Sequence, residues 1–156
     1  MTHSSALPTD SSLIPQDGWR WAPAWVLAFV ALWPASGIAE GVMVLGALAA
    51  IVLLLLGRFR GGTRLLSGPA WALTSVLFFA YWFPQLISAF DAIDRGRALR
   101  ESLVDLRYLP FLWLAASAVA NARGRHVTFS GLAIIVAVWT LDALLQVAFG
   151  TSPLFW

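Results

Sequence analysis

Stretches of apolar residues, separated by short polar or charged segments, make up most of the chain. The stretches cover approximately residues 21–39, 41–57, 67–90, 106–122 and 127–149. About 20 apolar residues in a helix cross a hydrocarbon core of about 30 Å, so each stretch is close to the length of one crossing. The pattern predicts an all-α fold, a polytopic transmembrane helical bundle of about five spans.

The boundary between the first two predicted spans is marked by Pro34, Gly37 and Glu40. A single helix across this region would be far too long and would hold all three residues in its middle, where proline breaks a helix. We therefore expect a hairpin of two short spans, with one broken helix as the alternative.

Proline also shapes the third predicted span, residues 67–90. Pro69 suits its first turn, whereas Pro84 lies inside it and is expected to kink it and to free a backbone carbonyl one turn earlier. Gln85 and Ser88 follow this kink. They either line a cavity or are ordinary packing positions.

Composition supports the membrane class and excludes several others. Of the 156 residues, 60% are hydrophobic and 12% are charged, and the mean hydropathy is +0.78. Soluble domains carry about 25% charged residues. A disordered chain, a nucleic-acid partner and a secreted disulfide scaffold are thereby excluded. The chain has no cysteine and only two histidines, His3 and His126, so we expect neither a metal site nor a cofactor.

The N-terminal residues differ from the rest. Residues 1–17 lack arginine and lysine, include Asp10 and Asp17, and are rich in Ser, Thr and Pro. This is not the pattern of a signal peptide. We expect a disordered tail over residues 1–20 and a transmembrane region over residues 21–156.

Arginine placement gives an orientation. With five spans, six arginines fall on one side of the membrane: Arg20, Arg58, Arg60, Arg64, Arg123 and Arg125. The other side holds four: Arg95, Arg97, Arg100 and Arg107. Because cytoplasmic loops carry the excess of positive residues, the N-terminus is predicted to be cytoplasmic and the C-terminus to lie outside.

Residues 91–107 form the one charge-dense segment. Leu99, Leu103 and Leu106 recur at helical spacing, which predicts a short amphipathic helix on the outer membrane surface, and Arg97 can pair with Glu101. This segment is either a solvated connector or a site for an anionic, lipid-linked substrate. In the second case Arg100 and Arg107 are the substrate-binding candidates, because a guanidinium can bind phosphate oxygens bidentately.

Asp142 is the acidic residue inside the fifth predicted span. An ionisable group at mid-bilayer costs at least about 2.5 kcal/mol, so it usually faces protein, water or a partner. It shares a helix face with Gln146. We expect Asp142 to pair with Arg107 or Arg100 and fix the ends of two spans. Substrate handling by Asp142 and Gln146, or simple placement near the interface, are the alternatives.

Four segments, taken in order, resemble the N-terminal part of the O-antigen ligase and O-antigen polymerase family. They are residues 81–88 (YWFPQLIS), 106–109 (LRYL), 141–146 (LDALLQ) and 150–155 (GTSPLF). The family shares a span ending in serine, an external segment and a later Asp-xxx-Gln-xxx-Gly stretch. The resemblance covers roughly residues 70 to 155.

The resemblance implies a bacterial inner-membrane glycosyltransferase that is independent of metal. Such a protein transfers or polymerises a glycan carried on undecaprenyl pyrophosphate during lipopolysaccharide or other surface polysaccharide synthesis. The family's catalytic arginine and histidine lie in a loop beyond the matched stretch, so no catalytic residue carries over and this chain alone is expected to be inactive. The alternatives are a non-enzymatic accessory protein that binds a membrane-protein partner, and a small transporter subunit.

Overall fold

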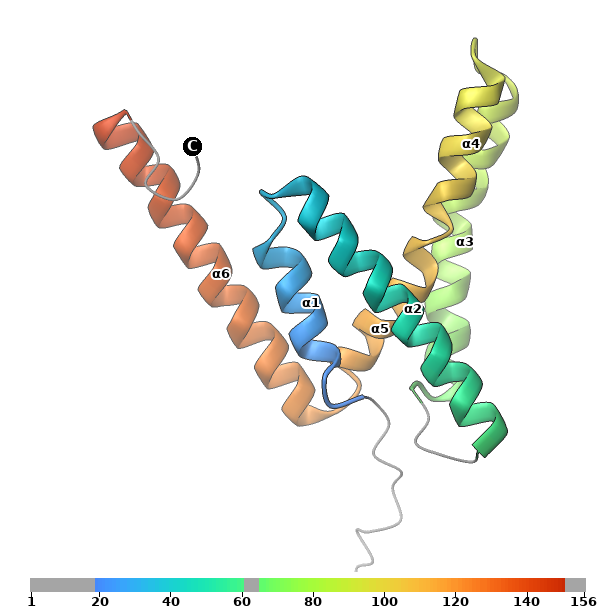
Figure 1. The fold of residues 1–156 in the computed structure, drawn as a ribbon, viewed down its shortest axis with the longest axis horizontal. Helices are drawn as coiled ribbons and strands as arrows, with labels where there is room; N and C mark the ends of the chain where they lie inside the picture. Colours follow the sequence, from blue (N-terminus) through green and yellow to red (C-terminus); the bar gives the residue numbers. More distant parts are fainter. Residues whose placement is uncertain (1–18, 61–64, 151–156) are drawn as a thin grey trace, which may run out of the picture.

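The computed structural model describes residues 19–60 and 65–150, and every regular element in that part of the chain is a helix. The all-α prediction is therefore confirmed for the described residues. The predicted disordered tail falls almost entirely outside them. The helices are α1 (Ala22–Ala31), α2 (Ser36–Arg60), α3 (Gly68–Phe90), α4 (Arg95–Asp105), α5 (Tyr108–Ala118) and α6 (Ala122–Phe149) (Figure 1).

Three of these helices are long and apolar enough to cross a membrane. They are Gly37–Gly57 within α2, the whole of α3 and the whole of α6. The second, third and fifth apolar stretches of the sequence therefore form helices of the expected kind. Their lengths of 21, 23 and 28 residues are consistent with a membrane protein.

The first predicted span, residues 21–39, is too long. Helix α1 ends at Ala31, and a turn leads into α2, which begins at Ser36. Pro34 lies in this turn, where its missing N–H costs no helical hydrogen bond. The expected hairpin of two helices is present, but its turn precedes Glu40, which becomes part of α2. With ten residues, α1 is roughly 15 Å long, about half of a hydrocarbon core.

The fourth predicted span, residues 106–122, is also shorter than expected. Helix α5 has 11 residues; α4 runs down the side of α3, and α5 then turns toward α1 and α2 while it still contacts the first half of α3 (Figure 1). The indole N–H of Trp113 in α5 donates to Ser75 Oγ of α3 over 3.0 Å, and the two rings Trp71 and Trp113 are 5.7 Å apart. Together α4 and α5 make one antiparallel return along α3.

Helix α4 is the short helix expected in the charge-dense segment, but it does not lie apart on a surface. It packs against α3, and the side that is buried there includes Ser102, which is 2% exposed. Leu103, expected on the apolar face that rests on the membrane surface, is 58% exposed, so it does not pack against α3. Backbone and small polar groups on α3 and α4 therefore decide the packing, and the leucine spacing does not.

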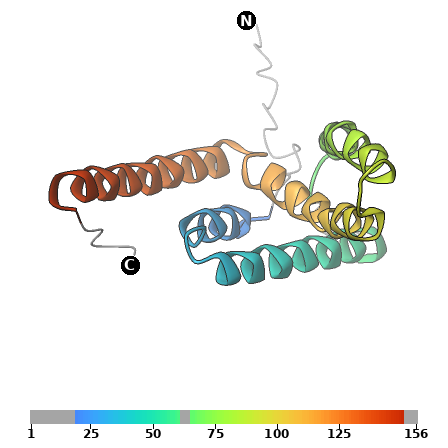
Figure 2. The same ribbon diagram turned by 90° about the horizontal axis from the view of Figure 1, so that it is seen from above.

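The core lies between α2 and α5, with α1 beside both. Met43 and Leu114 are fully buried in it. Gly46 lets α2 approach α5, since a Cβ there would come within 3.1 Å of the side chains of Phe111 and Leu114. Seen from above, α6 lies at one end of the molecule and the α3–α4 pair at the other (Figure 2).

Helix α6 is attached mainly to α1. Gly131 forms the closest approach: a Cβ at that position would lie 2.5 Å from a methyl carbon of Leu27. Elsewhere α6 is open, and only 6% of its most apolar stretch is buried inside the structure. The exposed side chains are apolar, so this surface requires lipid or other apolar groups around it.

Candidate functional site

The part of α3 around Pro84 is joined to α4 by two side-chain hydrogen bonds. Trp82 Nε1 donates to the carbonyl oxygen of Ser102 over 2.7 Å, and Gln85 Nε2 donates to Asp105 Oδ2 over 2.8 Å. The two donors lie on either side of Pro84, inside α3. Gln85 therefore has a partner on α4, and the sequence pattern gave no means of naming it.

Arg107 lies at the junction of α4 and α5 and is half-buried. Its guanidinium carbon is 5.4 Å from the ring centroid of Tyr108, and the carboxylates of Glu40 and Asp105 are near enough to attract it. Its Nε atom is buried and has no hydrogen-bond partner in the structure. Arg107 thus links the start of α2 to the α4–α5 junction.

The surroundings of Arg107 limit what it can bind. Glu40 and Asp105 attract the guanidinium from beyond ion-pair distance and make the surroundings of Arg107 negative. An anionic ligand would have to compete with Glu40 and Asp105, which repel it. The arrangement therefore suits Arg107 to holding helices together better than to binding a phosphate.

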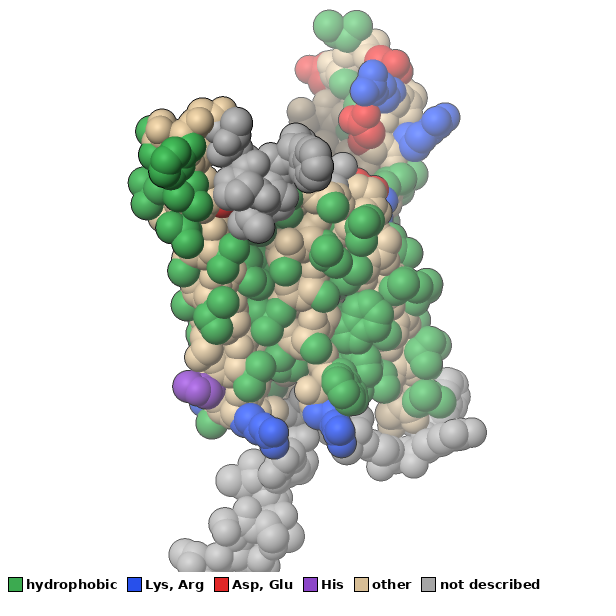
Figure 3. All heavy atoms as spheres, turned by 60° about the vertical axis from the view of Figure 1, so that its left-hand side comes forward, with side chains coloured by type: hydrophobic (Ala, Val, Ile, Leu, Met, Phe, Trp, Pro, Cys, Tyr) green, Lys and Arg blue, Asp and Glu red, His purple; other side chains and the backbone are tan. Residues whose placement is uncertain are grey.

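Arg100 has different surroundings. It is exposed on α4, as are Arg95 and Arg97. The predicted pair of Arg97 with Glu101 is confirmed, with Nε and Oε1 2.9 Å apart. The hydrogen bond from Arg97 to Glu101, and then the charge of Glu101, raise the pKa of the Arg97 guanidinium above its usual value. Charged side chains of both signs gather at this end of the molecule, beside an apolar middle zone (Figure 3).

Asp142 and Gln146 lie on α6, away from α4, which carries Arg100, and from the α4–α5 junction, which carries Arg107. Asp142 is 5% exposed, whereas the Gln146 side chain is exposed. The backbone N–H of Gly150 donates to the Gln146 carbonyl over 2.8 Å, and Gly150 adopts the left-handed conformation (φ 75°) that ends the helix. The glycine of the Asp-xxx-Gln-xxx-Gly stretch therefore serves as a helix cap.

The expected pairing of Asp142 with Arg107 or Arg100 is wrong. Among the described residues the ion pair found is Arg97 with Glu101, and the acidic neighbours of Arg107 are Glu40 and Asp105. Both ribbon views place the end of α6 on the opposite side of the molecule from α4 (Figures 1 and 2). The four candidate residues Arg100, Arg107, Asp142 and Gln146 do not form one site.

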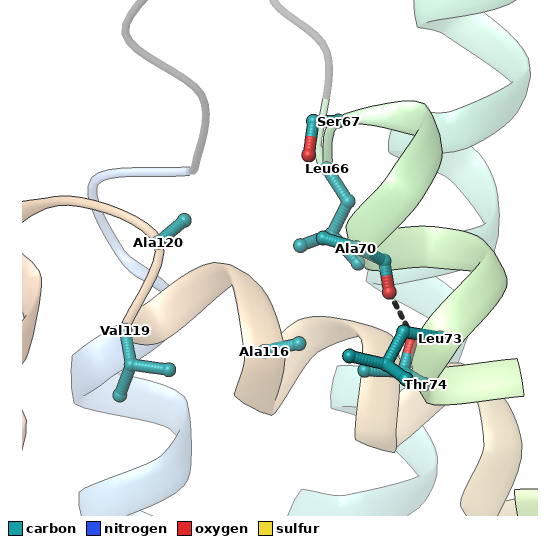
Figure 4. Close-up of a pocket in the computed structure, with 8 residues that line it drawn as sticks. All are labelled: Leu66, Ser67, Ala70, Leu73, Thr74, Ala116, Val119 and Ala120. Atoms are coloured by element: carbon teal, nitrogen blue, oxygen red, sulfur yellow. Dashed lines mark hydrogen bonds between the residues drawn. The ribbon is translucent and has the colours of Figure 1, made fainter. Parts of the chain in front are cut away.

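A separate hollow lies at the other end of α3, where it meets the end of α5. The cavity has a volume of about 290 Å³. It is lined by Leu66, Ser67, Ala70, Leu73, Thr74, Ala116, Val119 and Ala120 (Figure 4). The Thr74 hydroxyl donates to the Ala70 carbonyl over 2.8 Å, which leaves a largely apolar lining. Sequence analysis did not identify this hollow, although its small residues Ala70 and Ala116 permit it.

No set of three or more His, Cys, Asp or Glu side chains in the described part of the chain could hold a metal ion. The polar groups found there are instead the hydrogen bonds that join α3 to α4 and the exposed arginines of α4, Arg95, Arg97 and Arg100. Comparison with known proteins gives no further guide to function: no protein-family model, no curated protein and no solved structure matches this chain.

Proposed function

We propose that the chain is the N-terminal part of an O-antigen ligase-like glycosyltransferase of the bacterial inner membrane, acting on a glycan linked to undecaprenyl pyrophosphate. The ordered segments of residues 81–88, 106–109, 141–146 and 150–155 support this proposal. The all-helical fold with three helices of spanning length is compatible with it. The chain by itself is expected to transfer no glycan, because it holds no counterpart of the family's catalytic loop.

The observation that carries the proposal is the exposed arginine row of α4 at one end of the helices. Trp82 and Gln85 fix α4 to α3, so Arg100 is presented from a rigid hairpin. A pyrophosphate offers several anionic oxygens that a guanidinium can bind in a fork. We therefore assign the contact with the lipid-linked pyrophosphate to Arg100, and a positioning role to Arg107.

Asp142 and Gln146 receive a different role. They lie on α6, away from α4, and Asp142 is buried. We propose that Asp142 stabilises the packing of α6 and that Gln146 contributes its carbonyl to the helix end. With these roles, the Asp-xxx-Gln-xxx-Gly stretch shared with the family serves helix packing and helix capping.

We also propose five membrane crossings, with the N-terminus in the cytoplasm. Helix α1 together with its flanking residues supplies the first crossing, because α1 alone is too short; α2 supplies the second, α3 the third, the combined α4–α5 return the fourth and α6 the fifth. The support is the alternating direction of these segments along the chain (Figure 1). The greater number of arginines at the end where α1 and α6 begin supports this orientation.

The proposal is tested by measuring binding of undecaprenyl pyrophosphate to the purified chain in lipid nanodiscs. Replacing Arg100 by Gln should weaken binding about tenfold, because a charge-assisted hydrogen bond is worth about 1.5–3 kcal/mol. Arg95→Gln removes the same charge from the same helix and serves as the matched control. Equal weakening by both variants, or binding no tighter than that of uncharged undecaprenol, would contradict the assignment.

One observation favours the accessory-protein alternative. The apolar surface of α6 is almost wholly exposed and could bind another membrane protein. If this alternative is correct, the purified chain should bind a membrane-protein partner through α6 and show no preference for undecaprenyl pyrophosphate over undecaprenol. The same binding measurement therefore separates the two functions.

A further inference from the structure

The cavity between α3 and α5 differs from the α4 site in position and in chemistry. Its lining comes from the first turns of α3, from the last turns of α5 and from the link to α6 (Figure 4). It therefore lies at the end of the helices where α6 begins, whereas α4 begins at the opposite end (Figure 1). A cavity of about 290 Å³ holds part of a long chain better than a whole compact ligand, for which pockets of about 300–1,000 Å³ are usual.

Positive charge lies at the rim of this cavity. Arg125 donates from a guanidinium nitrogen to the carbonyl of Val119 over 3.4 Å, and Val119 itself lines the cavity. Arg123 is exposed in the first turn of α6, two residues before Arg125. The two stretches that supply the lining, residues 41–90 and 106–141, contain no Asp or Glu. Within the described part of the chain, the helices that line the cavity, α3 and α5, carry no acidic residue, and Arg125 lies at its rim.

We infer that this cavity binds an anionic phospholipid, with part of an acyl chain against Ala70, Thr74 and Ala116 and the phosphate beside Arg123 and Arg125. The apolar lining accounts for the chain, and the arginines account for the sign of the headgroup. Basic pockets between transmembrane helices on the cytoplasmic side of membranes bind anionic headgroups in this way. The inference does not depend on the glycosyltransferase proposal, because it concerns other residues at the opposite end of the helices.

The test uses native mass spectrometry of the full 156-residue chain released from vesicles of phosphatidylcholine containing phosphatidylglycerol with the same acyl chains. The chain should retain phosphatidylglycerol in preference to phosphatidylcholine. The double variant Arg123→Gln/Arg125→Gln should reduce that preference, with about a fivefold loss for each arginine. The double variant Arg123→Lys/Arg125→Lys keeps both charges and should retain most of the preference.

Two further arms locate the lipid and separate it from a free anion. Ala116→Leu fills the cavity and should lower phosphatidylglycerol retention while leaving both arginines in place. Inorganic phosphate at the same concentration should not displace the lipid, because it lacks an acyl chain. Circular dichroism of each variant checks that the helices are retained.

Three results would overturn the inference. The first is equal retention of the two phospholipids by the unaltered chain. The second is an equal loss of preference in the charge-matched control Arg95→Gln/Arg97→Gln, at the other end of the molecule. The third is unchanged retention in a folded Ala116→Leu variant, which would place the lipid outside the cavity.

Discussion

Gly131 is the residue through which α6 rests on α1. Its missing side chain leaves room for Leu27, and a Cβ there would lie 2.5 Å from a leucine methyl carbon. Gly41 offers a contrast, because nothing lies within 4 Å of the place where its Cβ would be. A side chain is therefore excluded at Gly131 and tolerated at Gly41. The difference arises from the contact of Gly131 with Leu27, which lies far away in the sequence.

Replacing Gly131 by leucine should therefore separate α1 from α6. Overpacking of this kind costs about 1–3 kcal/mol, so the thermal midpoint of the chain in mild detergent should fall. Gly41→Leu is the matched control and should leave the midpoint unchanged or raise it slightly, since glycine weakens a helix. Equal midpoints for Gly131→Leu and the unaltered chain would show that α1 and α6 do not pack as described.

Arg107 gives a second test at the scale of one residue. Arg107→Gln should lower the free energy of unfolding by about 1 kcal/mol, and with it the thermal midpoint, because the attraction of the guanidinium to Glu40 and Asp105 is lost. Arg100→Gln should leave the midpoint unchanged, since Arg100 is exposed. A loss of undecaprenyl pyrophosphate binding in Arg107→Gln without a loss of stability would instead make Arg107 a substrate contact.

Sequence spacing revealed only local partners at this scale. The pairing of Arg97 with Glu101 follows from their separation of four residues on one helix and is confirmed. The approach of Arg107 to Glu40, and of Gln85 to Asp105, joins residues on different helices. Such contacts depend on how the helices pack, and one sequence without its fold contains no signal for them.

At the scale of elements, the α3–α4 hairpin is held by polar groups near a proline. Trp82 and Gln85 provide the donors, while Ser102 and Asp105 provide the acceptors. Leucine periodicity in α4 predicted the helix correctly, and it carried no information on which side packs against α3. Leu103 is exposed because hydrogen bonding of Ser102 and Asp105 to α3 fixes the rotation of the helix.

Gln85→Leu should loosen this hairpin, because the Asp105 carboxylate then loses its amide donor. The chain has no cysteine, so spin labels at Ile87→Cys and Leu103→Cys report the α3–α4 distance without background. The distance distribution should lengthen or broaden in Gln85→Leu and stay unchanged in the control Ser88→Ala. An unchanged distribution in both would mean that the Gln85 hydrogen bond does not hold α4.

Asp142 tests the role of α6 as an element. Asp142→Leu should reduce accumulation of the chain in membranes and lower its stability by about 1–3 kcal/mol, because a buried carboxylate that is hydrogen-bonded or paired contributes to packing. Thr140→Leu changes an exposed residue of the same helix and should have little effect. Normal accumulation of Asp142→Leu, with loss of activity in a full-length parent, would make Asp142 a functional residue.

At the scale of the molecule, hydropathy located five apolar stretches but not their true lengths. The second, third and fifth became long helices, while the first ends early near Pro34 and the fourth yields only α5, from Tyr108 to Ala118. Hydropathy averages over a window and does not register a turn inside it. Nor did it predict that α4 and α5 would share the return along α3.

The proposed five-crossing topology predicts where the C-terminus lies. Alkaline phosphatase fused after Trp156 should be active, since the C-terminus is expected to be periplasmic and the enzyme folds only there. A fusion in the link between α2 and α3 should be inactive, because that link is expected to be cytoplasmic. Activity measured in whole cells with the reverse pattern would overturn the orientation.

The length of α6 has a consequence for behaviour in bilayers of different thickness. The first turns of α6 carry Arg123 and Arg125, and its apolar part, residues 127–149, extends roughly 35 Å, somewhat beyond a hydrocarbon core of about 30 Å. Such hydrophobic mismatch is relieved by tilting. Because α6 is attached mainly through α1, it can tilt about the contact between Gly131 and Leu27 while the α2–α5 core keeps its packing. Membrane thickness would then set the angle of α6 to the rest of the molecule.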